Sequence, residues 1–238
     1  MKTTIISSRK GGAGKTTLSL NLATLACQQG KKKVALLDLD PQGSSRFWDS
    51  LRVADYPDVR KVGVNDLLIE LSELEESGYD FVFIDMPPTE KKWIKDAMTH
   101  ADLVLIPTKA SPLDIHSASS SLEWASDAGT KVSWVINGAS VLSSTPEIVF
   151  EQLKATAKVC KTIVHERNDF VISVGLGKSV TEFAPNSKAA AEIDSLWMRE
   201  MTNQDLYASL QEDIENMNLQ EEISQKITEN TILFFQNS

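Results

Sequence analysis

The 238-residue chain has few cysteines and no long apolar segment. No run approaches the roughly 20 apolar residues that a membrane-spanning helix requires, and the first residues have the pattern of a strand, not of a signal peptide. Cys27 and Cys160 lie far apart without metal-ligand spacing, as do the three histidines. These absences argue against a disulfide scaffold, a His/Cys metal centre and a membrane-spanning protein. We therefore expect a cytoplasmic protein with reduced thiols.

The remaining composition is that of an ordinary globular protein, with 42% hydrophobic and 24% charged residues. The net charge of −9 is unevenly spread, because residues 201–238 hold seven acids against Lys226 alone. We predict a single globular domain over residues 1–200 and an acidic helical tail over 201–238, packed on the same domain or binding a partner. The tail carries one apolar stripe at helical spacing: Leu206, Leu210, Ile214 and Met217.

Short, β-branched-rich apolar runs alternate with segments of helical period along the first 160 residues. This alternation predicts an α/β fold, a doubly wound and mostly parallel sheet with helices on both faces. The weakly patterned residues 49–63 are expected to be a surface excursion. The predicted strands are Thr4–Ile6, Val34–Leu39, Phe81–Ile84, Leu103–Ile106, Val132–Ile136 and Thr162–Val164, and the predicted helices are Thr17–Gln29, Val64–Glu76, Leu113–Ala128 and Pro146–Val159.

A glycine-rich loop joins the first predicted strand to the first predicted helix, which is the placement of a phosphate-binding loop. Glycines let successive backbone N–H groups converge on phosphate oxygens, and the helix that follows aims its positive N-terminus at them. Lys15 adds a point charge, and the Thr16 hydroxyl can bind Mg²⁺. The sequence therefore predicts a nucleoside triphosphate site formed by Gly11, Gly12, Ala13, Gly14, Lys15, Thr16 and Thr17.

The loop departs from the ordinary P-loop pattern at its start, where Arg9 replaces an expected glycine and a second lysine, Lys10, precedes the glycines. A cation there points away from its own phosphates unless another subunit approaches, which suggests a shared, dimeric site. The pattern resembles the deviant Walker A loop of the ParA/MinD family of ATPases. The resemblance implies that Lys10 reaches across a homodimer to the partner's nucleotide and acts in catalysis as an arginine finger does. The alternative, a solvated turn, is disfavoured by the flanking strand and helix.

Acidic residues follow two further strands. Asp38 and Asp40 end the second predicted strand, and Asp85 ends the third in a Walker B arrangement, where a carboxylate can hold Mg²⁺ or its water. The resemblance implies that Asp40 positions the attacking water while Asp38 lies nearer the metal. The alternative is that Asp40 only initiates the Pro41 turn. Metal-binding candidates are thus Thr16, Asp38 and Asp85, and catalytic candidates are Lys10, Lys15 and Asp40.

Later segments extend the resemblance to about residue 200. Residues 105–114 resemble the loop after the fourth strand of small ParA proteins, both ParF-like and VirC1-like, and residues 164–190 resemble the family's C-terminal signature. Asn137, after the fifth predicted strand, is expected to offer its amide to a purine base as in relatives. A plain turn-forming asparagine is the alternative.

Four lysines are candidates for DNA contact. Lys154, Lys158 and Lys161 have near-helical spacing and would form one basic stripe, and Lys188 matches a family position where a basic residue binds DNA without sequence preference. A solvated lysine face is the alternative, because helices commonly carry such stripes. An ATP-driven dimer would double the patch and raise its affinity for DNA.

The resemblance implies a slow ATPase, using ATP and Mg²⁺, that dimerises with ATP, binds non-specific DNA on the nucleoid and is stimulated by a ParB/ParG-like centromere-binding adaptor to segregate plasmid or chromosome. Positioning of another cargo, or a role in conjugal transfer, remains open. A metabolic ligase of the dethiobiotin-synthetase type is the alternative of a different class, although Lys10 and the Asp40 segment disfavour it. No membrane contact is expected, because a MinD-type membrane helix would be basic and the tail is acidic.

Overall fold

The computed structural model describes residues 1–89 and 91–201. Residues 1–197 form one compact unit. The predicted acidic helix at 201–238 lies outside the described residues except for Met201, so the predicted division at residue 200 stays a prediction. None of the helices in the described ranges is long and apolar enough to cross a membrane.

The described strands form one sheet in the order β3-β2-β4-β1-β5-β6-β7, with β8 also pairing with β6. Every pairing is parallel, so the predicted α/β fold with a parallel sheet is confirmed. Because all the strands point the same way, the loops at their carboxyl ends lie along one edge of the sheet. The strands are β1 (Lys2–Ile6), β2 (Val34–Asp38), β3 (Asp58–Lys61), β4 (Phe81–Asp85), β5 (Leu103–Thr108), β6 (Lys131–Ala139), β7 (Lys158–Val159) and β8 (Val164–His165).

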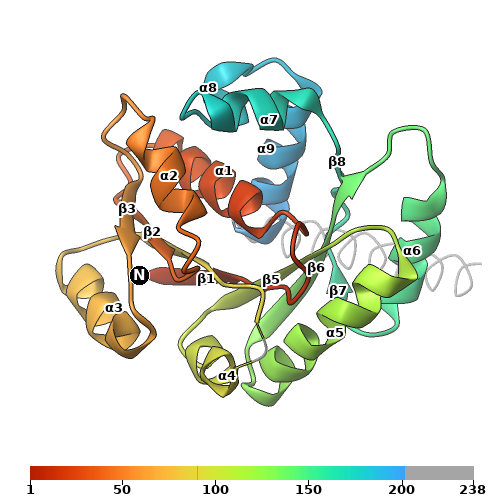
Figure 1. The fold of residues 1–238 in the computed structure, drawn as a ribbon, viewed down its shortest axis with the longest axis horizontal. Coiled ribbons are helices and arrows are strands. Elements are labelled where there is room, and N and C mark those ends of the chain that lie inside the picture. Colours follow the sequence, from red (N-terminus) through yellow and green to blue (C-terminus); the bar gives the residue numbers. More distant parts are fainter. Residues whose placement is uncertain (90, 202–238) are drawn as a thin grey trace, which may run out of the picture. The chain divides into compact units, whose positions relative to one another are not determined.

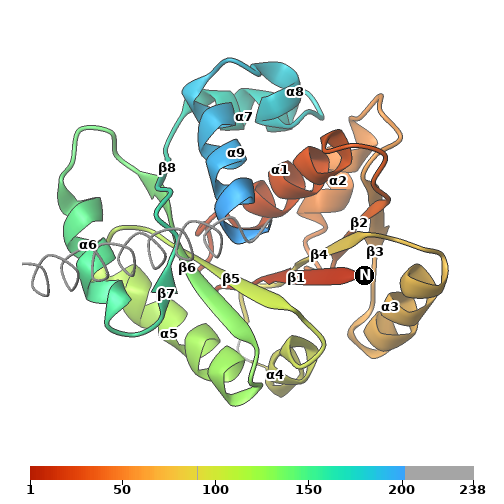
Figure 2. The same ribbon diagram turned by 180° about the vertical axis from the view of Figure 1, so that it is seen from behind.

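Helices cover both faces of this sheet, as predicted (Figure 1). One group of helices packs on the same face as α1, and a second group packs on the opposite face. The view from behind shows the same two groups (Figure 2). The first group is α1 (Lys15–Gln28), α2 (Ser44–Ser50), α7 (Asn168–Gly175), α8 (Val180–Phe183) and α9 (Lys188–Glu200); the second is α3 (Leu67–Glu76), preceded by the 3₁₀ turn Val64–Asp66, with α4 (Lys92–Met98), α5 (Pro112–Asp127) and α6 (Thr145–Lys154).

The central strands are buried on both faces, which explains why they are nearly continuous apolar runs. Ile5, Leu36 and Ile84 are fully buried in β1, β2 and β4. On the α1 side, α9 reaches the sheet through an edge-to-face contact of Trp197 with Phe81, whose ring centroids are 5.3 Å apart. The core thus holds β1 and β4 in fixed positions beneath the loops that follow them.

The sequence prediction of secondary structure was wrong over residues 49–63 and at the end of the predicted helix Pro146–Val159. The predicted strand Thr162–Val164 is also shifted, because β8 is Val164–His165. Residues 49–63 are not only a surface excursion, because they contain the end of α2 and the edge strand β3. The alternating charged residues of β3 gave no clear apolar signal, and its pairing with β2 decides its conformation. The predicted helix Pro146–Val159 ends at Lys154, and Lys158–Val159 instead pair with Ser133 and Trp134 of β6.

Candidate nucleotide-binding site

The glycine-rich loop lies between β1 and α1 and is held in place from β6. Gly14, the residue before α1, has φ of +90°, and a Cβ there would lie 2.0 Å from the Asn137 side-chain nitrogen. That nitrogen, Nδ2, donates a hydrogen bond to the carbonyl oxygen of Ala13 at 2.7 Å. Only glycine fits this backbone angle and this close approach. Asn137 lies within β6, not after the strand as predicted, and its amide contacts the loop; a contact with a base stays a prediction.

Lys15 is buried in the first turn of α1, with 6% of its surface exposed. Its Nζ donates to the carbonyl oxygen of Lys10 at 3.3 Å, so the ammonium lies inside the curve of the loop. Burial lowers the pKa of Lys15, while the nearby charges of Asp85 and Asp40 raise it. A buried cation surrounded by backbone and carboxylates is suited to an anionic ligand such as a phosphate.

Asp85, at the end of β4, is almost completely buried. Its Oδ2 accepts hydrogen bonds from the hydroxyls of Thr16 at 2.7 Å and Ser45 at 2.9 Å. Its Oδ1 is buried and accepts none from the described residues. Burial raises the pKa of Asp85 to about 6, and the charge of Asp38 adds to this, while the two hydroxyls and Lys15 oppose it.

Asp38 is the register partner of Asp85 on the neighbouring parallel strand. Its Oδ1 accepts from the backbone N–H of Asp40 at 3.0 Å and its Oδ2 from that of Arg46 at 3.1 Å. Burial raises its pKa, which these hydrogen bonds counter. Asp40 accepts from the backbone N–H of Gln42 at 2.9 Å, so it does form the turn at Pro41. The predicted role of Asp40 in positioning the attacking water stays a prediction.

These groups fit a bound magnesium ion. The Thr16 hydroxyl and the carboxylates of Asp38 and Asp85 are hard oxygen donors, and Oδ1 of Asp85 is an orphaned buried acceptor that a cation, or water bound to it, would satisfy. A bound Mg²⁺ would neutralise phosphate charge beside Lys15.

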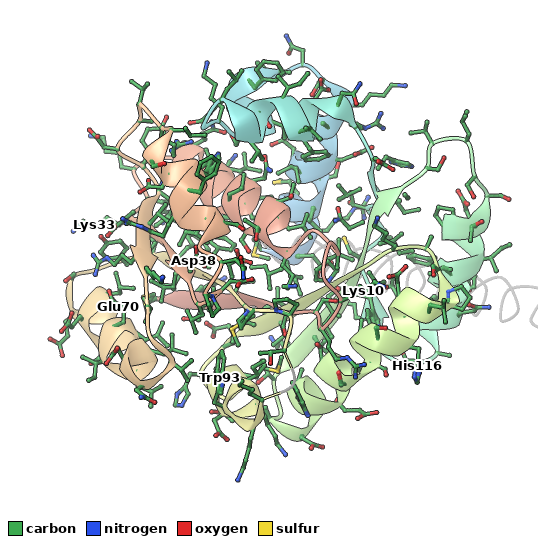
Figure 3. The ribbon with its side chains drawn as sticks, in the orientation of Figure 1. Lys10, Lys33, Asp38, Glu70, Trp93 and His116 are labelled. Atoms are coloured by element: carbon green, nitrogen blue, oxygen red, sulfur yellow. The ribbon has the colours of Figure 1, made fainter. Side chains whose placement is uncertain are left out.

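Lys10 lies at the start of the loop and faces α5 (Figure 3). Its Nζ lies 3.5 Å from Oδ1 of Asp114, in the first turn of α5, and nearly half of its side chain is exposed. The lysine therefore has an ion-pair partner within its own chain. The predicted reach of Lys10 to the nucleotide of a second copy stays a prediction.

A family model described as the CobQ/CobB/MinD/ParA nucleotide binding domain matches residues 4–231. The chain belongs to this family. The predicted resemblance to ParA/MinD proteins is thus confirmed, and the chain has the ATPase fold of that family. The glycine-rich loop, the buried Lys15 and the buried carboxylates of Asp38 and Asp85 lie in its nucleotide-binding domain.

Proteins with several different roles are similar to this chain. The maintenance of carboxysome distribution protein A of Halothiobacillus neapolitanus is 29% identical over 200 residues, covering 80% of this chain and 91% of that protein. The virulence plasmid ParA family protein pGP5-D of Chlamydia psittaci is 25% identical over 248 residues, covering 82% and 93%. The septum site-determining protein MinD of Pyrococcus horikoshii, solved with Mg-ADP, has a TM-score of 0.68 at 18% identity, covering 85% and 97%.

The four lysines proposed for DNA do not form the predicted helical stripe. Lys154 ends α6 and lies 3.5 Å from Glu151, Lys158 is in β7, and Lys161 is in the loop after it. Lys188 begins α9. The spacing of four and three residues indicated a helix, but the chain leaves α6 after Lys154 to pair with β6. The role of these lysines stays a prediction, now without the stripe as support.

Sequence reasoning missed two residues that contact the site. Ser45 binds Asp85, and Asp114 binds Lys10. Ser45 is one of two adjacent serines outside any motif, and Asp114 ends the 105–114 segment that resembles small ParA proteins but was not itself predicted to make a contact. Both contacts depend on how distant segments meet at the sheet edge.

Proposed function

We propose that the chain is a ParA-type ATPase that forms a homodimer with ATP, binds DNA without sequence preference and hydrolyses ATP slowly until a centromere-binding adaptor stimulates it. The observation that carries this proposal is the second lysine at the start of the phosphate loop. Lys10 is half-exposed at the edge where nucleotide would bind, so its ammonium is accessible to a second copy of the chain. This second lysine disfavours the alternative of a metabolic ligase.

The hydrolysis that we propose is phosphoryl transfer to water, in which positioning and charge do most of the work. Lys15 stabilises charge on the transferred group, and Lys10 of the second copy adds to it. Thr16 and Asp85 would hold Mg²⁺, which would supply further neutralisation of that charge. Asp40, two residues after Asp38 in the loop that follows β2, orients the attacking water. ATP and Mg²⁺ are thus the proposed cofactors.

Segregation of plasmid or chromosome DNA, on the nucleoid, is the proposed role. One similarity favours a second candidate, the positioning of another cargo, because one of the most similar relatives is described as maintaining carboxysome distribution. The two candidates share the ATP-dependent dimer and the DNA contact, and they differ in the adaptor that recruits the cargo. A small adaptor protein that stimulates hydrolysis would separate them by what else it binds.

The proposal is tested by measuring binding to random-sequence duplex DNA without nucleotide, with ADP and with ATP at fixed salt, while light scattering follows the mass. ATP-dependent doubling of mass together with DNA binding is expected. Lys15→Ala should abolish both by removing ATP binding, whereas Lys31→Ala, an exposed lysine beyond the far end of α1, should change neither. A constant mass with no DNA binding would favour the ligase alternative.

The DNA surface is tested separately. Replacing Lys154, Lys158, Lys161 and Lys188 by Glu should weaken DNA binding while ATP binding is retained. Unchanged DNA affinity in this variant would place the contact elsewhere.

A further inference from the structure

Ser45 is a fully buried polar residue between two exposed neighbours, Ser44 and Arg46, in the first turn of α2. Its hydroxyl donates to Oδ2 of Asp85 at 2.9 Å. The same oxygen accepts from Thr16 at 2.7 Å. Two hydroxyls from two different segments therefore converge on one carboxylate oxygen and leave the other, Oδ1, without a donor among the described residues.

This arrangement fixes the orientation of the Asp85 carboxyl. A terminal carboxylate rotates easily about its last side-chain bond, because that torsion is broad. Thr16 alone would restrain it from one side, and Ser45 restrains it from the direction of α2. The backbone N–H of Arg46, next to Ser45, also holds Asp38. The start of α2 thus contacts both register-paired carboxylates.

We propose that Ser45 is a positioning residue for the magnesium site, an inference that rests on the proposed function. By holding Oδ2 together with Thr16, Ser45 keeps Oδ1 as the oxygen that accepts from the cation's water. Removing the Ser45 hydroxyl leaves Oδ2 held by Thr16 alone, so the carboxylate turns more easily and binds Mg²⁺ more weakly. Because α2 follows Asp40–Gly43 directly, the same hydrogen bond links the cation site to the segment that we propose orients the attacking water.

The test compares the full chain with Ser45→Ala and with a matched control, Ser44→Ala. Ser44 is exposed. ADP binding is measured by calorimetry in EDTA, and Mg²⁺ is then titrated into the ADP-saturated proteins. Ser45→Ala should bind ADP in EDTA within about twofold of the unaltered chain but should lose about tenfold in Mg²⁺ affinity, as expected when a partner of a metal-binding carboxylate is removed. Ser44→Ala should change neither.

Two results would overturn the proposal. Unchanged Mg²⁺ affinity in Ser45→Ala would show that the hydroxyl does not orient Asp85, and an equal loss of ADP affinity with and without Mg²⁺ would show a purely structural role. If Ser45→Ala does not fold, Ser45→Cys, similar in size but a weak donor, gives the same comparison. Absence of ADP binding by the unaltered chain would instead overturn the proposed function, and this role with it.

Discussion

The ammonium of Lys10 and the carboxylate of Asp114 lie 3.5 Å apart within one chain. If Lys10 acts on the nucleotide of a second copy, it must leave Asp114 when the dimer forms. Asp114 thus competes with the dimer for the same lysine.

Asp114→Asn should therefore strengthen ATP-dependent dimerisation by a few-fold, the size expected for a partly exposed ion pair of up to about 1 kcal/mol. Asp114 is in the first turn of α5 and not at its N-cap, Ser111, so the substitution removes only a charge–dipole interaction of about 0.3–1 kcal/mol and α5 should be kept. Lys10→Ala should leave ATP binding largely intact and weaken the dimer. Sedimentation with ATP measures the strength of the dimer in both variants. If the Asp114→Asn dimer is only as strong as that of the unaltered chain, Asp114 does not compete with the dimer for Lys10.

Asp85→Asn should stabilise the protein in the absence of nucleotide and Mg²⁺. The folded state raises the pKa of Asp85 from 3.8 to about 6, so the folded chain holds its proton more tightly than the unfolded chain does. The free energy of unfolding therefore falls as pH rises from about 4 to 6, and the cost is fully present above that range. The variant lacks this cost.

Urea denaturation in EDTA between pH 4 and 8 measures the difference. The free energy of unfolding of Asp85→Asn should exceed that of the unaltered chain by almost nothing near pH 4 and by at most about 3 kcal/mol above pH 6. A difference that did not vary with pH would contradict the assignment. Mg²⁺ should bind the variant poorly, since the carboxylate is gone.

Gly14→Ala should disrupt the phosphate loop. Its φ of +90° is unfavourable for alanine by about 1–2 kcal/mol, and the new Cβ would meet the Asn137 amide at 2.0 Å. Gly129→Ala is the matched control, because its φ is +70° with no atom within 4 Å of a Cβ. We expect Gly14→Ala to lose ATP binding and more stability than Gly129→Ala; equal losses in denaturation and unaltered ATP binding would argue against the close contact.

Arg52→Ala should be strongly destabilising. The buried guanidinium lies 4.3 Å from the centre of the Trp48 ring and donates to both carboxylate oxygens of Glu182, so it joins α2 to α8. Removal of the guanidinium leaves the partly buried Glu182 carboxylate with the backbone N–H of Ser179 but without a cation, which costs up to about 3–5 kcal/mol. Lys95→Ala, which breaks an exposed pair with Asp127, should cost less than about 1 kcal/mol. Thermal or chemical denaturation distinguishes the two, and similar small losses would refute the role of Arg52.

The central strands of the sheet could be predicted from the sequence, but the strands at its edges could not. The strands around β1 are fully buried, so their apolar runs identify them without any structure. The edge strand β3 and the short β7 are partly exposed and contain charged residues, and their pairing alone makes them strands. The predicted basic stripe failed for this reason. The spacing of Lys154, Lys158 and Lys161 fits a helix, but α6 ends at Lys154 and Lys158 lies in β7.

Local chemistry determined the core of the site. A glycine with positive φ, a lysine and a threonine must be adjacent in the chain to surround a phosphate, so the loop from Lys10 to Thr17 is legible in the sequence. The carboxylates of Asp38 and Asp85 can also be predicted from the sequence, because the end of a buried strand is a local feature.

Tertiary structure decided the contacts that complete the site. The pairing of Asp38 with Asp85, the hydroxyl of Ser45 on Asp85, the amide of Asn137 on the loop and the pairing of Lys10 with Asp114 join segments that are 40 or more residues apart. Their geometry follows from the order of parallel strands, which brings the loops to one edge. A sequence specifies which groups stand at strand ends, but only the packed sheet specifies which of them meet.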